Sequence, residues 1–490
     1  MNSEPRLTGE PRRRRHIFDL GRRPGARIVA TTTATSLVVG LLTLGAPAAM
    51  AAPCDTWPPL GNGGGGAGSG SSSSGGAPAA PSNPATPWHN GASGYIPVLE
   101  GRTTTVELLT GPTSPNNTVD RFAITGTDLG ILWDNGATGD DDRRVHMALG
   151  DTMGDCSVPG DEWRSNILFR SNDRDLSDGM RFVDAPMERE GMAKSILPRR
   201  TNPDGTPFEG ETTVIPTAGV EVDGTQYLRY MSVEDWGDPG EWTTNYSALA
   251  SSDDDGENWT EVDGTARTGT GNPALVPEAL GAPFTHHVDG QMSAFLKAGG
   301  YVYEFLTPSG RNGSARLARV PEASIEEMDA YEYWDGAGWV DDHTKAAVVL
   351  DGQVSELSVT WSERLGAYIA LYTDQNNDVV MRQAENPWGP WSGRDILLSY
   401  EHLPTLYGAF AHPWSPAIEA NGDDLYFTLS TWDAYNVFLM KTDFAQLPER
   451  TAPSPNARMR TADDSWTRDT PDPAETGETV LVDRIPIPEA

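Results

Sequence analysis

Two aspartates stand inside stretches that otherwise have the composition of β-strands. Asp128 lies in ITGTDLGILWDNG, residues 124–136, and Asp151 lies in HMALGDTMGD, residues 146–155. A packed sheet favours Val or Ile at such positions, so a carboxylate indicates a strand that borders a wet cavity. The two aspartates are about equally far from the middle of the turn at residues 134–142. We therefore expect an antiparallel hairpin that brings both side chains to the same end.

Two carboxylates held close together have the chemistry that glycoside hydrolysis requires. One carboxyl, kept protonated, donates to the leaving oxygen, while the other activates water or attacks carbon. Two nearby negative charges also raise the pKa of one of the pair. Carboxyl groups about 5–5.5 Å apart favour retention and a gap of ~6.5–9.5 Å favours inversion, and the sequence is compatible with either. The structural alternative is that each Asp, flanked by Gly or Thr, caps a turn.

The elements that would position this pair form a repeated pattern. Five strand-like segments end at a polar corner, and each has a further short strand before and after it; they are RRVHMALGDTMGD (143–155), QYLRYMSVEDWGD (226–238), YVYEFLTPSGRNG (301–313), AYIALYTDQNND (367–378) and LYFTLSTWDAYN (425–436). The strand before the fifth segment is expected in PAIEANGDD, residues 416–424. Radial stacking buries both faces of such meanders, which predicts an all-β fold, a five-bladed β-propeller.

A short turn motif supports this fold over a two-sheet sandwich. SDDDGENW, residues 252–259, has the Ser-x-Asp-x-Gly-x-x-Trp pattern of the Asp-box hairpin seen in many propellers. There the Asp caps a tight turn and the Trp packs between blades. Five similar units are also too many for a sandwich. The innermost strands would surround a funnel, and the two aspartates would meet at its mouth.

The ends of the chain have a different composition. Residues 1–51 combine eight Arg, an uncharged stretch and Ala49-Met50-Ala51, the three parts of a secretory signal peptide, although a membrane anchor is the alternative. Residues 52–87 form a Gly/Ser/Pro-rich linker, and residues 451–490 form a flexible tail in which Thr479–Ile487 offers a further strand. The catalytic propeller is expected at residues 88–450, in a secreted or cell-envelope protein.

Charge and cysteine content restrict the partners. The formal net charge is −34, and removal of the Arg-rich leader makes it more negative. Such a surface repels nucleic acid and anionic lipid, so we expect a monomer that acts on a neutral polysaccharide and does not bind a membrane in its mature form. Cys54 and Cys156 are the two cysteines, enough for one disulfide. No metal or cofactor is expected, although the acidic runs at 140–142 and 374–378 have oxygen ligands that suit calcium.

Several motifs together resemble a known family. TDLG, ALGDT, WRSNILFRSND, YVYEFLTPSGRNGSARLARV and YEYWDGAGW occur in the order found in secreted actinobacterial endo-D-arabinanases, which were long catalogued as a domain of unknown function. The resemblance covers roughly residues 100–445. It implies a five-bladed propeller that cleaves D-arabinofuranosyl linkages in arabinogalactan and lipoarabinomannan, with inversion. It also implies that Asp128 and Asp151 are the catalytic pair, without assigning acid and base.

Other residues are candidates for holding the substrate. Arg164 and Asn166 follow the hairpin and would bind sugar hydroxyls or pin the loop to its blade. Arg311 ends a strand at the same kind of corner as Asp151, and His287 would face the mouth. Trp432 would stack on a furanose ring or pack between blades.

Two other classes of protein fit part of this pattern. A non-catalytic sugar-binding or cell-envelope scaffold propeller would share the fold but would not need both carboxylates. A sialidase would need an arginine cluster and a Tyr nucleophile, and the chain has a single Asp-box and a strongly acidic composition.

Overall fold

The computed structural model describes residues 94–447 and 479–487, apart from residues 156, 159, 239, 278–279 and 281–284. The expected signal peptide, the linker, most of the tail and both cysteines lie outside the described residues. None of the helices in the described ranges combines the length and the apolar composition that crossing a membrane requires.

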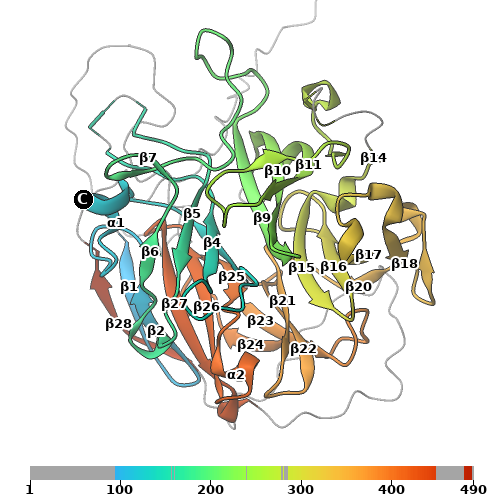
Figure 1. The fold of residues 1–490 in the computed structure, drawn as a ribbon. Coiled ribbons are helices and arrows are strands. Elements are labelled where there is room, and N and C mark those ends of the chain that lie inside the picture. Colours follow the sequence, from blue (N-terminus) through green and yellow to red (C-terminus); the bar gives the residue numbers. More distant parts are fainter. Residues whose placement is uncertain are drawn as a thin grey trace, which may run out of the picture. The chain divides into compact units, whose positions relative to one another are not determined.

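Five small sheets stand around a common centre and form a five-bladed β-propeller, as the repeats predict (Figure 1). From the innermost strand outward, blade 1 contains β3 (Leu129–Asp134), β4 (Val145–Leu149), β5 (Ile167–Ser171) and β6 (Phe182–Asp184). Blade 2 contains β9 (Thr213–Val222), β10 (Thr225–Trp236), β11 (Trp242–Ser252), β13 (Arg267–Thr268) and β14 (Thr285–His286), with β12 (Thr260–Glu261) also paired to β11.

The remaining three blades follow the same order. Blade 3 contains β15 (Met292–Ala298), β16 (Tyr301–Thr307), β17 (Ala315–Pro321), β18 (Glu332–Trp334) and β19 (Trp339–Val340), with β20 (Val348–Leu350) also paired to β17. Blade 4 contains β21 (Ser358–Ser362), β22 (Ala367–Thr373), β23 (Val379–Ala384) and β24 (Asp395–Leu398). Blade 5 contains β25 (Leu406–Ala411), β26 (Asp424–Thr431), β27 (Asn436–Asp443) and β2 (Thr103–Leu108).

Blade 5 joins the two ends of the ring. Its outermost strand, β2, comes from before blade 1 and pairs antiparallel with β27. The side-chain oxygens of Thr103 and Thr442 lie 2.7 Å apart in this pairing, and both residues are fully buried. The ring is therefore closed by backbone hydrogen bonds between segments that are far apart in the sequence.

A two-stranded ribbon lies beside this closure. β1 (Tyr95–Glu100) pairs antiparallel with β28 (Val480–Pro486), and the two strands form a sheet separate from the blades (Figure 1). The strand expected in Thr479–Ile487 is thus confirmed. The expected flexible tail therefore contains an ordered element that returns to the N-terminal side of the fold.

Hydrophobic contacts hold neighbouring blades together. Val220 and Leu249 of blade 2 cluster with Val302 and Val320 of blade 3, and all four are buried. Each sheet is covered on both faces by its neighbours, so strands such as β22 are buried along nearly their whole length. This explains why aromatic and β-branched residues occupy both faces of the inner strands.

The Asp-box forms the hairpin turn that its sequence predicts. Asp254 accepts hydrogen bonds from Ser252 Oγ at 2.8 Å and from the backbone N–H of Asn258 at 2.8 Å. Trp259 donates from Nε1 to the carbonyl of Gly256 at 3.0 Å and packs against the core cluster that blades 1 and 2 share.

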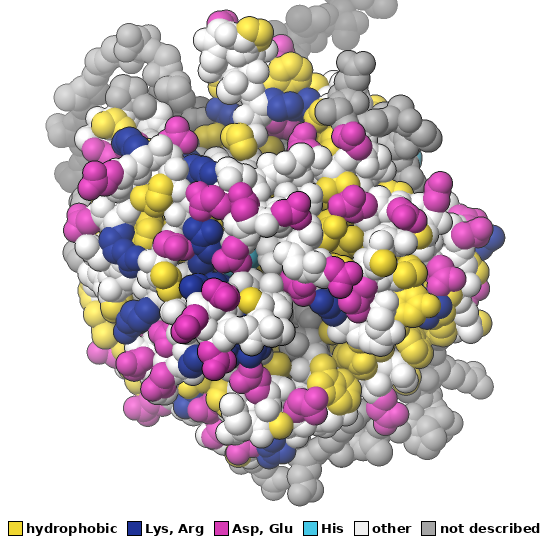
Figure 2. Space-filling model, viewed as in Figure 1, with side chains coloured by type: hydrophobic (Ala, Val, Ile, Leu, Met, Phe, Trp, Pro, Cys, Tyr) yellow, Lys and Arg dark blue, Asp and Glu magenta, His cyan; other side chains and the backbone are white. Residues whose placement is uncertain are grey.

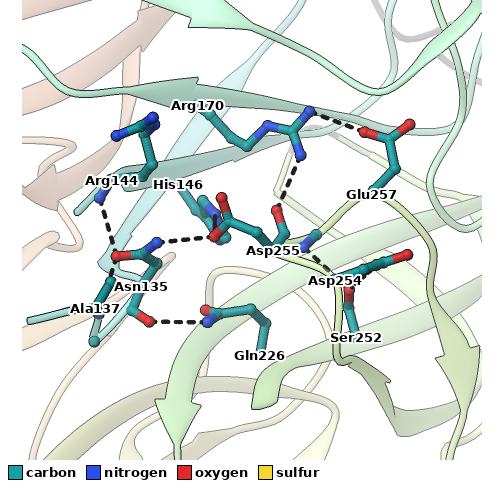
Figure 3. A network of polar contacts seen from close by, with 12 residues as sticks. Asn135, Ala137, Arg144, His146, Arg170, Gln226, Ser252, Asp254, Asp255 and Glu257 are labelled. Carbon is teal, nitrogen blue, oxygen red and sulfur yellow. Dashed lines mark hydrogen bonds and ion pairs between the residues drawn. The ribbon is translucent and has the colours of Figure 1, made fainter. Parts of the chain in front are cut away.

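The same turn fastens blade 2 to blade 1 (Figure 3). Asp255 Oδ1 accepts from Asn135 Nδ2 at 2.9 Å and lies 2.9 Å from Nε2 of the buried His146. Arg170 of blade 1 donates to the Asp255 carbonyl and to Glu257, at 3.1 and 2.9 Å. The acidic residues of this motif therefore act in blade packing.

The connections contain short elements. They are α1 (Thr118–Phe122), α2 (Pro416–Glu419), the strand pair β7 (Met187–Arg189) and β8 (Met192–Ala193), and the 3-10 helices η1 (Leu176–Asp178), η2 (Pro273–Leu275), η4 (Val288–Gly290), η5 (Glu322–Ser324), η6 (Met328–Ala330), η7 (His343–Lys345) and η8 (Phe444–Gln446).

One predicted strand is wrong. PAIEANGDD, residues 416–424, contains the helix α2, and the strand paired before β26 is β25, ten residues earlier in the chain. Pro416 occupies the first turn of α2, where its missing N–H costs nothing, whereas a central strand would lose a ladder hydrogen bond. The inner strand of blade 5 is therefore LYGAFA, Leu406–Ala411.

Candidate active site

The predicted hairpin brings the two aspartates together. Asp128 directly precedes β3, and Asp151 follows β4. The two strands are antiparallel, and Leu129 of β3 pairs with Leu149 of β4. The N–H of Gly150 donates to the carbonyl of Asp128 at 3.2 Å. Both carboxylates therefore lie at the same end of the innermost hairpin of blade 1, as expected for antiparallel strands.

The backbone beside Asp128 is irregular. Leu129 has φ +70° and Gly130 has φ +96°, and the β3–β4 register shifts between Leu129 and Ile131. A left-handed conformation is unfavourable for Leu, of the order of 1–3 kcal/mol, and such strain concentrates at functional sites. A bulge of this kind changes the direction in which the adjoining side chain points. A methyl group on Gly150 would collide with Oδ1 of Asp128, so the carboxyl lies directly over that glycine.

The aspartates line a cavity of about 720 Å³ at the centre of the propeller. All five blades contribute to its wall through their innermost strands or the residue just before them, namely Leu129, Ile215, Met292, Leu357 and Tyr407. Aromatic side chains of longer loops and strand ends extend the wall; they are Trp236, Trp242, Tyr400 and Trp432. The cavity thus combines apolar and aromatic surfaces with polar and charged groups.

Asp128 has few hydrogen-bond donors. It is 5% exposed, and its Oδ2 accepts a hydrogen bond from the hydroxyl of Tyr407 at 3.0 Å. Its Oδ1 is buried and has no partner among the described residues. Burial raises the pKa of Asp128 to about 8, and the neighbouring charges of Asp151 and Glu356 contribute to the rise.

Asp151 has more donors. It is 6% exposed, and Thr213 Oγ1 donates to its Oδ1 at 2.6 Å. Burial raises the pKa of Asp151 to about 7, while hydrogen bonds from Thr213 and Trp163 and the charge of Arg199 act in the opposite direction. The surroundings of Asp151 therefore favour its ionised form more than those of Asp128 do.

A third carboxylate lies near the pair. Glu356, just before β21, lines the cavity and accepts hydrogen bonds from Arg311 Nε at 3.0 and 3.1 Å and from its Nη2 at 2.5 Å. The Arg311 guanidinium also lies over the rings of Trp242, Tyr407 and Trp432, 5.0–5.4 Å from their centroids. This cation is therefore neutralised by Glu356 and enclosed by aromatic rings.

The cavity wall is acidic. The carboxylates on it are Asp128, Asp151, Asp238, Glu241, Glu356, Asp374 and Asp433, and the arginines are Arg311 and Arg484. Acidic side chains are also spread over the face of the molecule in Figure 2. A polyanionic ligand would be repelled, whereas a neutral one would not.

Two of the five substrate-binding candidates line the cavity. Arg311 and Trp432 do so, and Trp432 stacks on Tyr407 with ring centroids 4.1 Å apart. Trp236 lines the cavity as well, while Trp414 lies outside its wall, against the Arg174 guanidinium.

The other three candidates lie outside the cavity wall. Arg164 donates to the carbonyls of Phe122 and Ala123, at 3.1 and 2.5 Å, which fixes the loop after α1. Asn166 is fully buried and donates from Nδ2 to two backbone carbonyls at 2.7 Å. Both side chains thus satisfy backbone groups, the structural role that the sequence left open for them.

His287 is likewise packed inside blade 3. Its ring lies 4.3 Å from that of His343 and 5.7 Å from that of Tyr333, between centroids, and 2% of the residue is exposed. Burial lowers the pKa of His287 to about 2, and the charge of Arg267 contributes. A neutral imidazole in this position does not reach the funnel.

Residues that the sequence did not single out complete the site. Tyr407, Glu356, Thr213 and Trp242 contact the pair or the cation beside it. Tyr407 lies on the strand that was expected ten residues later, so its place at the funnel was missed. Within the described residues, no cluster of three or more His, Cys, Asp or Glu has the arrangement of a metal site.

Comparison with known proteins places these residues in a family. The profile of DUF4185, described as a domain of unknown function, matches residues 113–441. The Notoamide biosynthesis cluster protein J of Aspergillus sp. (strain MF297-2) is 29% identical over 332 residues, 64% of this chain and 81% of that protein.

The solved structures that match this fold are more distant in sequence. An exo-β-1,3-galactanase from Phanerochaete chrysosporium has 9% identity and a TM-score of 0.41, over 69% of this chain and 64% of its own. A Bacillus subtilis arabinanase has 13% identity and a TM-score of 0.35, over 65% of this chain and 96% of its own. At such low similarity the chemistry has to be argued from the residues of this chain.

Proposed function

The chain belongs to the DUF4185 family, and we propose that it is an endo-acting glycoside hydrolase that cleaves D-arabinofuranosyl linkages in cell-wall arabinan. One observation carries the proposal: two buried aspartates with raised pKa values, about 8 and about 7, share the wall of one cavity. A carboxyl that stays protonated near neutral pH, beside one that ionises, is the arrangement that acid–base hydrolysis of a glycoside needs.

We assign the general acid to Asp128 and the general base to Asp151. Asp128 keeps its proton to higher pH because it is buried beside the negative charge of Asp151, and the hydrogen bond from Tyr407 offsets this rise in its pKa only in part. Asp151 loses its proton first because Thr213 donates to it and Arg199 lies near it. When the pair carries one proton, we place that proton on Asp128, because Asp151 has the donors that favour an ionised carboxylate.

The reaction follows from these roles. Asp128 gives its proton to the glycosidic oxygen as the bond from that oxygen to the anomeric carbon breaks. Asp151 takes a proton from a water molecule whose oxygen bonds to the same carbon from the opposite face. The products are two sugar chains, and the configuration at the cleaved carbon is inverted. Asp151 then releases its proton to solvent water and Asp128 takes up a proton from solvent water, so both groups return to their starting forms.

The substrate class rests on two lines of support. The acidic cavity wall accepts a neutral chain and repels a polyanion. The choice of D-arabinofuranosyl linkages comes from the TDLG and GDT motifs, which carry the resemblance to endo-D-arabinanases and hold Asp128 and Asp151. An enzyme for such a wall polymer acts outside the cell membrane, in keeping with the Arg-rich leader, and we propose that it works there as a monomer without a cofactor.

The decisive experiment uses the purified full chain and mycobacterial arabinogalactan. We expect the parent to release oligosaccharides, and Asp128→Asn and Asp151→Asn to reduce the rate by about 10³-fold or more. Thermal unfolding of both variants shows whether they remain folded. A non-catalytic sugar-binding propeller predicts a different result, namely binding of the polymer by all three proteins and release by none.

A further inference from the structure

The ribbon of β1 and β28 lies outside the five blades but reaches the cavity. Tyr95 of β1 and Arg484 of β28 are both part of the cavity wall. Neither residue falls within 113–441, the part of the chain that the family profile matches. The ribbon thus lies outside the matched range, as β2 of blade 5 does, and it brings two side chains to the cavity wall.

The ribbon presents these two residues on one face. In the β1–β28 register, Tyr95 pairs with Pro486 and Pro97 pairs with Arg484, so Tyr95 and Arg484 are diagonal neighbours on the same side. The Arg484 guanidinium lies over the Tyr95 ring, 4.7 Å from its centroid. Among the described residues, the contact found for this guanidinium is the one with the Tyr95 ring.

Both ends of β28 are fixed to the propeller. Thr479 is buried and accepts a hydrogen bond from the N–H of Thr103 at 2.9 Å. Ile487 is fully buried, and its N–H donates to the carbonyl of Gly94 at 3.2 Å. Between these anchors the strand is largely exposed. Arg484 is therefore carried by an element with a defined position, which is what a binding subsite requires.

A row of side chains connects the aspartate pair to the ribbon. Tyr407 donates to Asp128 and stacks on Trp432, and Asp433 follows at the end of β26. Gly94, next to Tyr95, lies so close to the backbone of Asp433 and Ala434 that a side chain there would collide with it. The wall from the reacting centre to Tyr95 is thus continuous, and most of it is aromatic.

We propose that Tyr95 and Arg484 form a distal subsite that binds a neutral sugar unit of the same polysaccharide chain, away from the bond being cleaved. The proposal rests on the function proposed above, and it adds a place at which the polysaccharide is held. The Tyr95 ring offers a flat apolar surface to a sugar ring, and the guanidinium offers N–H donors to its hydroxyl oxygens. A substrate too short to reach the ribbon would gain nothing from this subsite.

The test compares two substrate lengths on the full chain. We measure kcat and KM with long arabinan chains and with the shortest arabinan oligosaccharide that the parent cleaves. Arg484→Gln and Tyr95→Ala should each raise KM for long chains about tenfold, with kcat unchanged, because hydrogen bonds to a charged donor and ring contacts are lost. Their kcat/KM for the short oligosaccharide should stay close to that of the parent.

The control variant is Ile485→Ala, in the same strand. Ile485 pairs with Ile96, on the opposite face from Arg484, and is 50% exposed, so this change should affect neither substrate. An equal loss on both substrates, or no loss on long chains, overturns the distal subsite while the hydrolase remains. A parent that cleaves no arabinan of either length overturns the proposed function and the subsite together.

Discussion

Two groups of buried carboxylates lie close to the funnel, and their surroundings are opposite. Glu304 of β16 is fully buried and accepts hydrogen bonds from Arg229 at 3.1 Å and from Arg267 at 2.7 and 2.8 Å. Ser293 of β15, which lines the cavity, donates to it at 2.7 Å. Burial alone would raise the pKa of Glu304, but Arg229 and Arg267 outweigh it and hold that pKa at about 2.

Asp128 and Asp151 are almost as well buried but have no arginine in contact. Tyr407 and Thr213 supply neutral donors, Oδ1 of Asp128 has no partner among the described residues, and both pKa values lie well above the ordinary range. Burial therefore does not separate the two groups, because all three side chains are 6% exposed or less. The donors separate them: the carboxylate of the ion cluster is paired with two arginines, whereas the two aspartates proposed to react accept hydrogen bonds from neutral donors.

The largest expected effect of this difference is on stability. Glu304→Gln leaves two buried guanidinium groups without their shared counter-charge, which should lower the free energy of unfolding by about 3–5 kcal/mol. Asp128→Asn should change it by less than about 1 kcal/mol at pH 7, because the Asp128 carboxyl, with a pKa of about 8, is mostly protonated and has a similar shape.

Urea unfolding of the full-length proteins at pH 7 measures both values. Glu332→Gln is the control for the loss of an acid–arginine pair, because Glu332 pairs with Arg319 at an exposed site and the change should be within about 0.5 kcal/mol. Similar losses in Glu304→Gln and Asp128→Asn would mean that the aspartate pair is as well stabilised as the ion cluster, and the distinction would fail.

A second expected effect concerns the position of the Asp128 carboxyl. In Gly150→Ala the new methyl group would collide with Oδ1 of Asp128, so the carboxyl has to turn away from its place in the cavity. We expect kcat/KM for arabinan to fall about a hundredfold, since small misplacements of a reacting group have effects of this size. Steady-state kinetics on the parent and the variant provide the measurement.

Gly338→Ala is the control variant for this test, because it adds the same methyl group at a position away from the site. No atom lies within 4 Å of the position that a methyl group would take at Gly338, and the residue is not part of the cavity wall. Parent-like activity in both variants would show that Asp128 tolerates displacement and is not the proton donor.

The aspartate pair was predictable because its geometry is local. Asp128 and Asp151 belong to one hairpin, and the alternating pattern of its strands sets which residues face each other. The five units were predictable for the same reason, since each meander pairs strands that are adjacent in the sequence. Arg164 and Asn166 show the limit of such prediction. A polar side chain can donate equally well to a backbone carbonyl and to a sugar hydroxyl, and the sequence does not distinguish the two roles.

Features that depend on distant pairing could not be predicted in this way. β2 finds its partner at the far end of the described chain, and no local pattern in Thr103–Leu108 indicates blade 5. β28 was expected as a strand, but its pairing with β1 was not, and that pairing brings Arg484 to the cavity. Tyr407 was missed because the strand that carries it was assigned to the segment that forms α2.

The smallest expected effect comes from removing the hydroxyl of Tyr407, which donates to Asp128. Tyr407→Phe keeps the ring that stacks on Trp432 and deletes the hydroxyl that donates to Oδ2. This hydrogen bond lowers the pKa of Asp128, so its loss should raise that pKa above about 8 and shift the alkaline limb of the kcat/KM profile to higher pH. The acid limb, set by the pKa of Asp151 at about 7, should stay in place. The less firmly held carboxyl should also lower kcat about tenfold.

Tyr227→Phe, which removes a hydroxyl bonded to Glu326 away from the cavity, should leave the profile unchanged. A Tyr407→Phe enzyme with a lower kcat but an unmoved alkaline limb would assign the proton to another group, and Glu356, which also lines the cavity, would then be the next carboxylate to test.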